Sequence, residues 1–388
     1  MKRAFVLLVA LVFFIPAVAT GWRRAQNATA DSYWVYIGTY TGSKSKGIYS
    51  YRFQASTGDV TALGLAAETV NPSFLAVSPD QKFLFAVNEV SDYGGTKSGA
   101  VSMFAIDRKT GHLALLNQVA SHGPGPCHVS LDKTGHFVLV ANYDGGSVAV
   151  FPVLRNGRLG QSSAFVQHTG HSINPQRQEG PHAHCIEVDG GNNHAIAADL
   201  GLDRLLVYRF DSSTGALTPN QPPFVQLQPG SGPRHIAFDP TGRFLYVVDE
   251  MGSTIYVFSY NPERGMLRPL QTISTLPKSF TGENYAAEIA VHPSGKVLYA
   301  SNRGQDTIAV FFIDPTRHTL MPVEYVSTRG KFPRNFAIAP GGKYMFVANQ
   351  NSDDVVVFRI DPASGHLTAT GQTLEVSSPV CVKFVSAE

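Results

Sequence analysis

Arginine, histidine and glutamate residues occupy matching places in a series of short apolar segments of this chain. In the stretch PRHIAFDPTGRFLYVVDE, which starts at residue 233, Arg234 and His235 precede the first apolar run, and Asp249 and Glu250 end the second. Imidazole and carboxylate groups can take up and release a proton, and guanidinium groups bind carboxylates and phosphates through paired hydrogen bonds. If the fold gathers such residues, they form an anion-binding site with acid/base capacity.

A recurrent unit of about 50 residues predicts the elements that carry these side chains. Two apolar runs are joined by a tight turn such as DPTG or HPSG, and a third and a weaker fourth run follow. The second run of each unit ends in one of six residues: Asn88, Asn142, Asp199, Asp249, Asn302 and Asn349. Units of four short antiparallel strands at this spacing are typical of β-propellers.

The two ends of the chain supply one more unit. YWVYIGTY, GIYSYRF and DVTALGLAAE near the N-terminus are expected to be second, third and fourth strands, and SPVCVKFVSAE at the C-terminus is the missing first strand. A ring that was not closed would leave blade edges unpaired and its two end faces exposed. The sequence therefore predicts an all-β fold, a seven-bladed β-propeller that spans residues 32–388 as one domain.

The hairpin between the first two strands brings the candidate residues to one end of each blade. The start of the first strand and the end of the second are neighbours in an antiparallel pair, and propellers place the first strand innermost. One mouth of the central channel should therefore collect a polar set: His128, Asn142, Tyr143, His182, His184, Asp199, Asp203, Arg204, Arg234, His235, Glu250, Glu288, Asn302, Arg303, Arg334 and Asn335. The spacing does not decide whether His182 or His184 faces the channel.

Part of this set has a purely structural interpretation. Asparagine and aspartate at strand ends commonly bind backbone groups of the following turn, and the residues that end the second strands fit this use. The first-strand residues fit it less well, because Phe74 and Cys381 occupy the same place in the two remaining units. We therefore expect the arginine, histidine and glutamate cluster to be functional.

The N-terminal segment MKRAFVLLVALVFFIPAVA predicts export. Two basic residues precede an apolar run, and Ala17, Val18 and Ala19 form a small-x-small cleavage site, so residues 1–19 are expected to be a signal peptide, with an uncleaved anchor as the alternative. Residues 20–31 are expected to be a flexible lead-in to a periplasmic or extracellular protein. The net charge of +2 predicts neither nucleic acid nor, after cleavage, a membrane as partner.

The cysteines and the possible metal ligands give little further information about the function. Cys127, Cys185 and Cys381 are expected to be buried free thiols, with one disulfide as the alternative. His182 and His184 have a spacing that metal ligands can have, but no companion motif completes a site. Glycine-rich stretches follow strands and precede no helix, so they predict no phosphate-binding loop. We expect no metal, no cofactor and a monomer.

The motifs, in their order along the chain, resemble the propeller-type lactonase family, whose named activity is 6-phosphogluconolactonase. The matching segments include YIGTYTG, GPHAHCIEVD, ADLGLDRLLVYRFD, GPRHIAFDPTGRFLYVVDE and AAEIAVHPSGKVLYASNRGQDTIAVF, and the resemblance extends over nearly all of the chain after residue 32. DLGLDR and SNRGQD are its most specific parts. The resemblance implies a seven-bladed propeller that hydrolyses a sugar lactone with the histidine, glutamate and arginine residues of the channel mouth.

Lactone opening requires an activated water, stabilisation of the tetrahedral oxyanion and a proton for the leaving alkoxide. As a hypothesis, Glu288, His184 or His235 acts as the base, and Arg234 (or Arg334) stabilises the oxyanion. The remaining candidates would bind a lactone or sugar acid: His128, His182, Asp199, Arg204, Arg303, Arg334 and Asn335.

Three alternatives stay open. The phosphorylated lactone of sugar catabolism is cytoplasmic, so predicted export favours an unphosphorylated aldonolactone or another cyclic ester. Relatives that resemble this family cyclise carboxymuconate, whose carboxylates the same basic mouth would bind. An exported propeller that binds a glycan or protein without catalysis is the alternative from another class.

Overall fold

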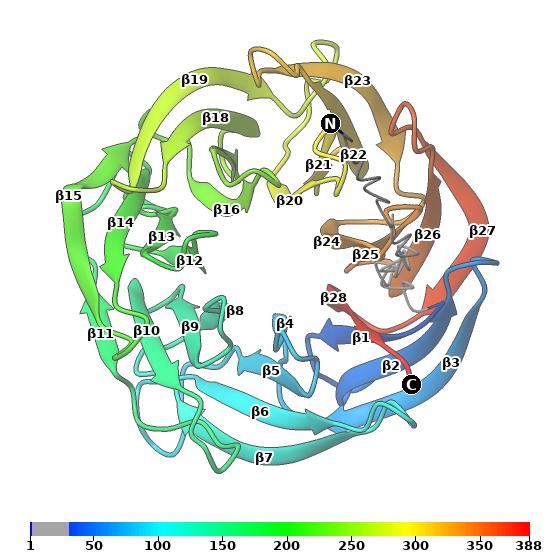
Figure 1. The fold of residues 1–388 in the computed structure, drawn as a ribbon, viewed down its shortest axis with the longest axis horizontal. Helices are drawn as coiled ribbons and strands as arrows, with labels where there is room; N and C mark the ends of the chain where they lie inside the picture. The colour runs from blue at the N-terminus through cyan, green and yellow to red at the C-terminus, as the bar shows by residue number, and fades with distance from the viewer. Residues whose placement is uncertain (2–30) are drawn as a thin grey trace.

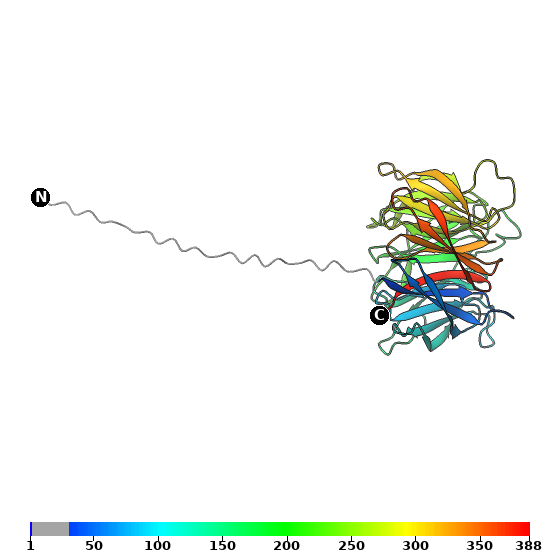
Figure 2. The same ribbon diagram turned by 90° about the vertical axis from the view of Figure 1, so that its right-hand side faces the viewer.

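The computed structural model describes Met1 and residues 31–388, so the predicted signal peptide and most of the predicted lead-in lie outside the described residues. Within them, 28 strands form seven four-stranded sheets arranged in a ring (Figure 1). Seen from the side, the ring is flattened (Figure 2). The prediction of a seven-bladed, all-β propeller is confirmed. The described part of the chain contains no helix that is long and apolar enough to cross a membrane.

Each blade has the same antiparallel order from the channel to the rim. The innermost strands are β4 (Leu75–Val77), β8 (Pro126–Leu131), β12 (Ala183–Val188), β16 (Pro233–Phe238), β20 (Ala286–Val291), β24 (Pro333–Ile338) and β28 (Pro379–Ser386). The second strands are β5 (Phe83–Asn88), β9 (Phe137–Asn142), β13 (His194–Asp199), β17 (Phe244–Asp249), β21 (Val297–Asn302), β25 (Tyr344–Asn349) and β1 (Ser32–Thr39). The third strands are β6 (Ala100–Ile106), β10 (Ser147–Pro152), β14 (Arg204–Phe210), β18 (Thr254–Asn261), β22 (Thr307–Ile313), β26 (Asp354–Ile360) and β2 (Gly47–Gln54). The outermost strands are β7 (Leu113–Ala120), β11 (Ala164–Gln167), β15 (Leu217–Gln226), β19 (Met266–Ser274), β23 (Leu320–Ser327), β27 (Leu367–Glu375) and β3 (Val60–Glu68).

The seventh blade joins the two ends of the chain, as predicted. Its strand order is β28-β1-β2-β3, and β1 pairs with β28 in a ladder that begins at Tyr33 and Ser386. The ladder pairs the inner edge of β1 and makes β28 the innermost strand of this blade.

The core lies between neighbouring blades. Second strands such as β9 and β21 are buried at every residue, whereas the outermost β19 is partly buried or exposed at every residue except Leu267. Blades pack face to face, so a second strand has an apolar neighbour on both sides and needs a continuous apolar run. Val248 of β17, for example, shares a cluster with Leu298 and Phe311 of the next blade.

A β-bulge near the start of the innermost strand determines which side chains reach the channel. The register with the second strand shifts in six blades: at Pro126/His128, Ala183/Cys185, Pro233/His235, Ala286/Ile289, Pro333/Asn335 and, opposite Gly38/Thr39 of β1, at Pro379/Cys381. A bulge sets two residues against one and bends the strand. Consecutive residues such as Arg234 and His235 can therefore both point toward the channel axis, which a regular strand would not allow.

Candidate active site

Glu250 is the centre of a charge cluster at the channel mouth, where the innermost strands begin. Its Oε1 lies 2.6 Å from Arg177 Nη2, and its Oε2 lies 2.6 Å from Arg303 Nη2 and 3.1 Å from Arg234 Nε. Burial alone would raise the pKa of Glu250, but Arg303, Arg234 and Arg177 together hold it well below its usual range. The carboxylate stays ionised and fixes three guanidinium groups.

Tyr143 connects His182 to this charge cluster. The two rings stack with centroids 4.5 Å apart, and His182 Nδ1 lies 3.0 Å from the Tyr143 carbonyl oxygen. Nδ1 therefore carries a proton, which it donates to that oxygen, and Nε2 of the neutral ring is an acceptor. Tyr143 also accepts a hydrogen bond from Arg177 at 3.2 Å, which ties the histidine to the arginines. Nε2 lies 3.3 Å from the exposed Glu179 carboxylate, which would stabilise a protonated ring.

Aromatic rings orient the guanidinium groups of the mouth. Arg177 lies over Tyr285, and Arg303 lies over Phe332 with its Cζ 5.2 Å from the ring centroid. Arg334 lies in the same way over Tyr40, whose hydroxyl donates to Glu89. Cation–π contacts of this kind restrict the planar guanidinium to a few orientations. We call the mouth cluster the set Tyr143, Arg177, His182, Arg234, Glu250, Arg303 and Arg334.

A layer of buried side chains lies directly below the mouth cluster, one from each blade. We call this layer the channel ring: Phe74, His128, Cys185, His235, Glu288, Asn335 and Cys381. Asn335 Oδ1 accepts the Val382 backbone N–H at 2.9 Å, and Cys381 accepts that of Leu75 at 3.3 Å, so these two ring side chains satisfy backbone groups of the next blade. The three cysteines are free and buried, as predicted.

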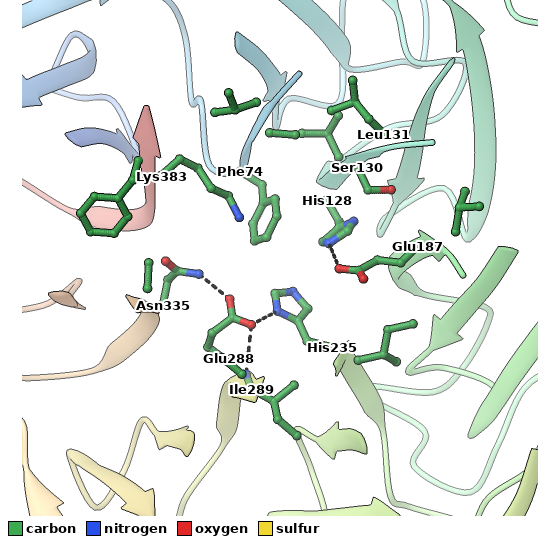
Figure 3. Close-up of a pocket in the computed structure, with 18 of the residues that line it drawn as sticks. Phe74, His128, Ser130, Leu131, Glu187, His235, Glu288, Ile289, Asn335 and Lys383 are labelled. Atoms are coloured by element: carbon green, nitrogen blue, oxygen red, sulfur yellow. Dashed lines mark hydrogen bonds and ion pairs between the residues drawn. The ribbon is translucent and has the colours of Figure 1, made fainter. Parts of the chain in front are cut away.

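Within the channel ring, His235 and Glu288 form a hydrogen-bonded pair (Figure 3). Nδ1 lies 3.0 Å from Oε1, and the carboxylate also accepts hydrogen bonds from Asn335 and from the Ile289 backbone. Burial lowers the pKa of His235, so the ring is neutral at pH 7. Burial would raise the pKa of Glu288, but chiefly the contact with His235 holds it below its usual value. The pair is thus an ionised carboxylate that orients a neutral imidazole.

The channel ring separates the mouth from a large cavity. Above the ring, between it and the mouth, a void of about 10 Å³ is barely large enough for one water. Below it, a cavity of about 670 Å³ extends toward the ends of the innermost strands (Figure 3). We call this the channel cavity; Ser130, Glu187 and Lys383 line it together with the ring residues.

The structure divides the predicted site residues between these layers. Arg234, Arg303, Arg334 and His182 lie in the mouth cluster, and the channel ring contains His128, His235, Glu288 and Asn335. His184 is the additional residue of the β12 bulge and is buried beneath Tyr143, with its Nδ1 3.7 Å from Cys127 Sγ. His182, which precedes the strand, is therefore the histidine at the mouth.

Besides His184, two predicted residues are not brought to either layer. Arg204 lies on the third strand β14, over the ring of Phe224 at 4.3 Å, and donates to Gln226. Asp199 is buried and accepts the backbone N–H of His182 at 2.8 Å, while its other oxygen contacts His168. Asp199 thus positions the backbone of the mouth histidine from behind.

The asparagines that end the second strands have structural partners, but not in the segment that was predicted. Asn142 donates to the Ser121 carbonyl at 3.1 Å, and Asn302 donates to the Thr275 carbonyl at 2.8 Å. These carbonyls belong to the connection that precedes the innermost strand, so the amides tie these blades to the connection that enters them. Asp199 does bind the following turn, because it accepts the Leu202 backbone N–H at 3.1 Å.

The chain is similar to known lactonases over almost all of the propeller. The family model described as "Lactonase, 7-bladed beta-propeller" matches residues 34–384. The chain belongs to this lactonase family. A 6-phosphogluconolactonase of Bacillus subtilis is 37% identical to this lactonase over 350 residues, which are 90% of this chain and 97% of the relative. The solved structure of a periplasmic gluconolactonase of Pseudomonas aeruginosa is 37% identical, with a TM-score of 0.86 over 92% of this chain and all of that one.

Sequence reasoning missed three groups of the lactonase mouth: Arg177, the pair formed by Tyr40 and Glu89, and the aromatic neighbours of the arginines. Arg177 lies in the long connection between β11 and β12, outside the repeat, so alignment of the units could not select it. The only signal was the length of that connection, because long loops in a compact domain are often functional.

Proposed function

We propose that this lactonase opens a sugar lactone with a water molecule activated at the mouth cluster. The observation that carries the proposal is the convergence of four arginines on one channel mouth beside a histidine whose tautomer is fixed. Water attack makes the carbonyl oxygen negative, and fixed guanidinium donors stabilise that charge without reorganising. Arg177 and Arg303 suit this role because Glu250 and an aromatic ring hold each of them in place.

His182 is the base that this geometry favours. Its Nε2 can take the proton of the attacking water, and Glu179 then stabilises the imidazolium. When the ring C–O bond of the tetrahedral intermediate breaks, the same proton can pass to the leaving alkoxide. His184, His235 and Glu288 are less suited, because they are buried below the mouth. Arg234 is only 2% exposed and serves to anchor Glu250.

The substrate that we propose is an unphosphorylated aldonolactone met outside the cytoplasm. The predicted signal peptide supports this choice, and so does the likeness to the periplasmic gluconolactonase of Pseudomonas aeruginosa. The likeness to the 6-phosphogluconolactonase of Bacillus subtilis supports lactone opening without distinguishing the two substrates.

A pH-stat assay of the mature protein with glucono-δ-lactone and its 6-phosphate tests the proposal. We expect turnover of the plain lactone with the higher kcat/KM, and a loss of about 100-fold or more in kcat in His182→Asn, as for removal of a general base. The asparagine amide can still donate to the Tyr143 carbonyl, so the fold should persist. Wild-type turnover in His182→Asn, with the loss found in Glu288→Gln instead, would move the base to the channel ring.

A further inference from the structure

The channel cavity exists because most residues of the next inward-facing layer have small side chains. Two positions after each member of the channel ring, the chain has Ala76, Ser130, Glu187, Ala237, Ala290, Ala337 and Lys383. Side chains two apart in a strand point to the same side, so this layer also faces the channel. The four alanines leave room for the cavity of about 670 Å³.

Two charged side chains of this layer have no close partner of opposite charge. Lys383 Nζ lies 4.9 Å from the centroid of Phe74, and it makes no ion pair within the described residues. Glu187 has His128 as its ion-pair partner among the described residues, with Nε2 4.0 Å from Oε1, while Lys133 and Lys383 act on it from a longer distance. Figure 3 places the ring of Phe74 between Lys383 and His128. A half-buried ammonium and a half-buried carboxylate thus face one cavity without neutralising each other.

A metal ion is the less favoured occupant. His128, Cys185 and Glu187 offer ligand atoms within 4.8 Å of one another. However, the Ile186 backbone N–H points at His128 Nδ1 from 3.5 Å, so the neutral imidazole carries its proton on Nε2, toward Glu187 and Cys185. A cation at Nε2 would have to displace that proton and reverse the tautomer. The protonated Nε2 is instead a donor for an oxygen-rich organic ligand.

We propose that the channel cavity binds a small hydroxy acid, with its carboxylate on Lys383 and its hydroxyl groups on Glu187 and Ser130. The lysine supplies a charge-assisted hydrogen bond, and the Glu187 carboxylate accepts from hydroxyl groups. Ser130 already donates to the Ile186 carbonyl, so its oxygen is an acceptor. The volume lies within the usual range for small-molecule sites. This site is separate from the mouth cluster because the buried channel ring lies between them.

Calorimetric titration with gluconate tests the proposal. We expect one gluconate per chain, no comparable binding of glucose, which lacks the carboxylate, and affinity at least ~10-fold weaker in Lys383→Met. Lys343→Met is the matched control, because it removes the same charge from an exposed hairpin, and it should bind like the wild type. Ala337→Leu fills the cavity without touching a charge and should also abolish binding.

The mouth variant distinguishes this site from the catalytic one. His182→Asn should bind gluconate in the channel cavity as the wild type does, whatever its turnover. Unchanged binding in both Lys383→Met and Ala337→Leu would overturn the proposal, and so would loss of binding in His182→Asn, which would place the ligand at the mouth. Binding that needs added zinc and disappears with a chelator would assign the site to a metal ion.

Discussion

Glu250 controls the electrostatics of the channel mouth, since its one carboxylate contacts three guanidinium groups. Arg234 and Arg303 are almost fully buried, at 2% and 6% exposure, so neither can be solvated if the carboxylate is lost. Removing one partner of a buried ion pair is costly because the remaining charge stays desolvated. The residue is therefore needed for the folded mouth as well as for any chemistry there.

We expect Glu250→Gln to lower the free energy of unfolding by about 3–5 kcal/mol at pH 7, measured by urea denaturation. Because the pKa of Glu250 is depressed in the folded state, its contribution is complete above the carboxyl's unfolded pKa and is lost as the pH falls toward the folded value. The difference between wild type and variant should thus be constant above about pH 5 and shrink below about pH 4. Exposed Glu263→Gln should change stability by less than ~0.5 kcal/mol.

The place of a residue in the repeat decided whether its role in the site could be predicted from the sequence. Arg234 and Arg334 occupy equivalent places at the start of innermost strands, and Arg303 follows the end of a second strand, so the topology alone brings them to one mouth. Arg177 lies in a connection without a counterpart, and its contact with Glu250 depends on the path of that loop. Glu288 and His235 were placed at the mouth, whereas the bulge turns them to the layer below it.

At the level of the element, the end of the second strand is a structural position, and in β17 the residue there is poorly suited to it. Most blades have an asparagine there, whose amide binds the connection entering the blade. In β17 the position is Asp249, a carboxylate whose Oδ2 accepts from Thr254 and whose Oδ1, like those of Asn142 and Asn349, has no hydrogen-bond partner among the described residues. Burial raises the pKa of Asp249 well above its usual value. The ionised carboxylate is thus unfavourable in the folded state.

Asp249→Asn should raise Tm at pH 7, because the amide is uncharged and can donate as its counterparts do. A raised folded pKa favours folding at low pH and costs stability as the pH rises above the unfolded pKa, so the gain should shrink toward pH 4. Differential scanning calorimetry at the two pH values measures this, with about 1 kcal/mol expected at pH 7. The reverse change, Asn302→Asp, should lower Tm at pH 7; an increase there would contradict the argument.

Periodicity predicted the blades but not the bulges. The apolar runs and the DPTG-type turns define where strands lie, since a second strand buried on both faces must be apolar throughout. A bulge adds one residue without disturbing this pattern, so the sequence left the choice between His182 and His184 open. The paired register of β12 and β13 settles it.

At the level of the whole molecule, one channel has two chemically different ends. The mouth has a cluster of arginines around Glu250, and the opposite end has the channel cavity with its separated lysine and glutamate. The ring that divides them takes one residue from every blade, so both ends depend on closure of the propeller.

Deleting residues 379–388 should prevent closure, because it removes β28 and leaves the inner edge of β1 unpaired. We expect a loss of cooperative thermal unfolding and self-association, measured by circular dichroism and size-exclusion chromatography. Deleting only Glu388, which forms an exposed ion pair with Arg108, is the control and should unfold like the full chain. A monomeric, cooperative product from the longer deletion would contradict a structural role for the closing strand.

The closing strand also links the cavity to the pairing of two distant parts of the chain. β28 pairs with β1, and it provides Cys381 to the channel ring and Lys383 to the cavity wall. A molecule in which β28 has not paired with β1 lacks the cation that faces the cavity, however many other blades have folded. Occupation of that compartment would therefore report that β1 and β28 have met.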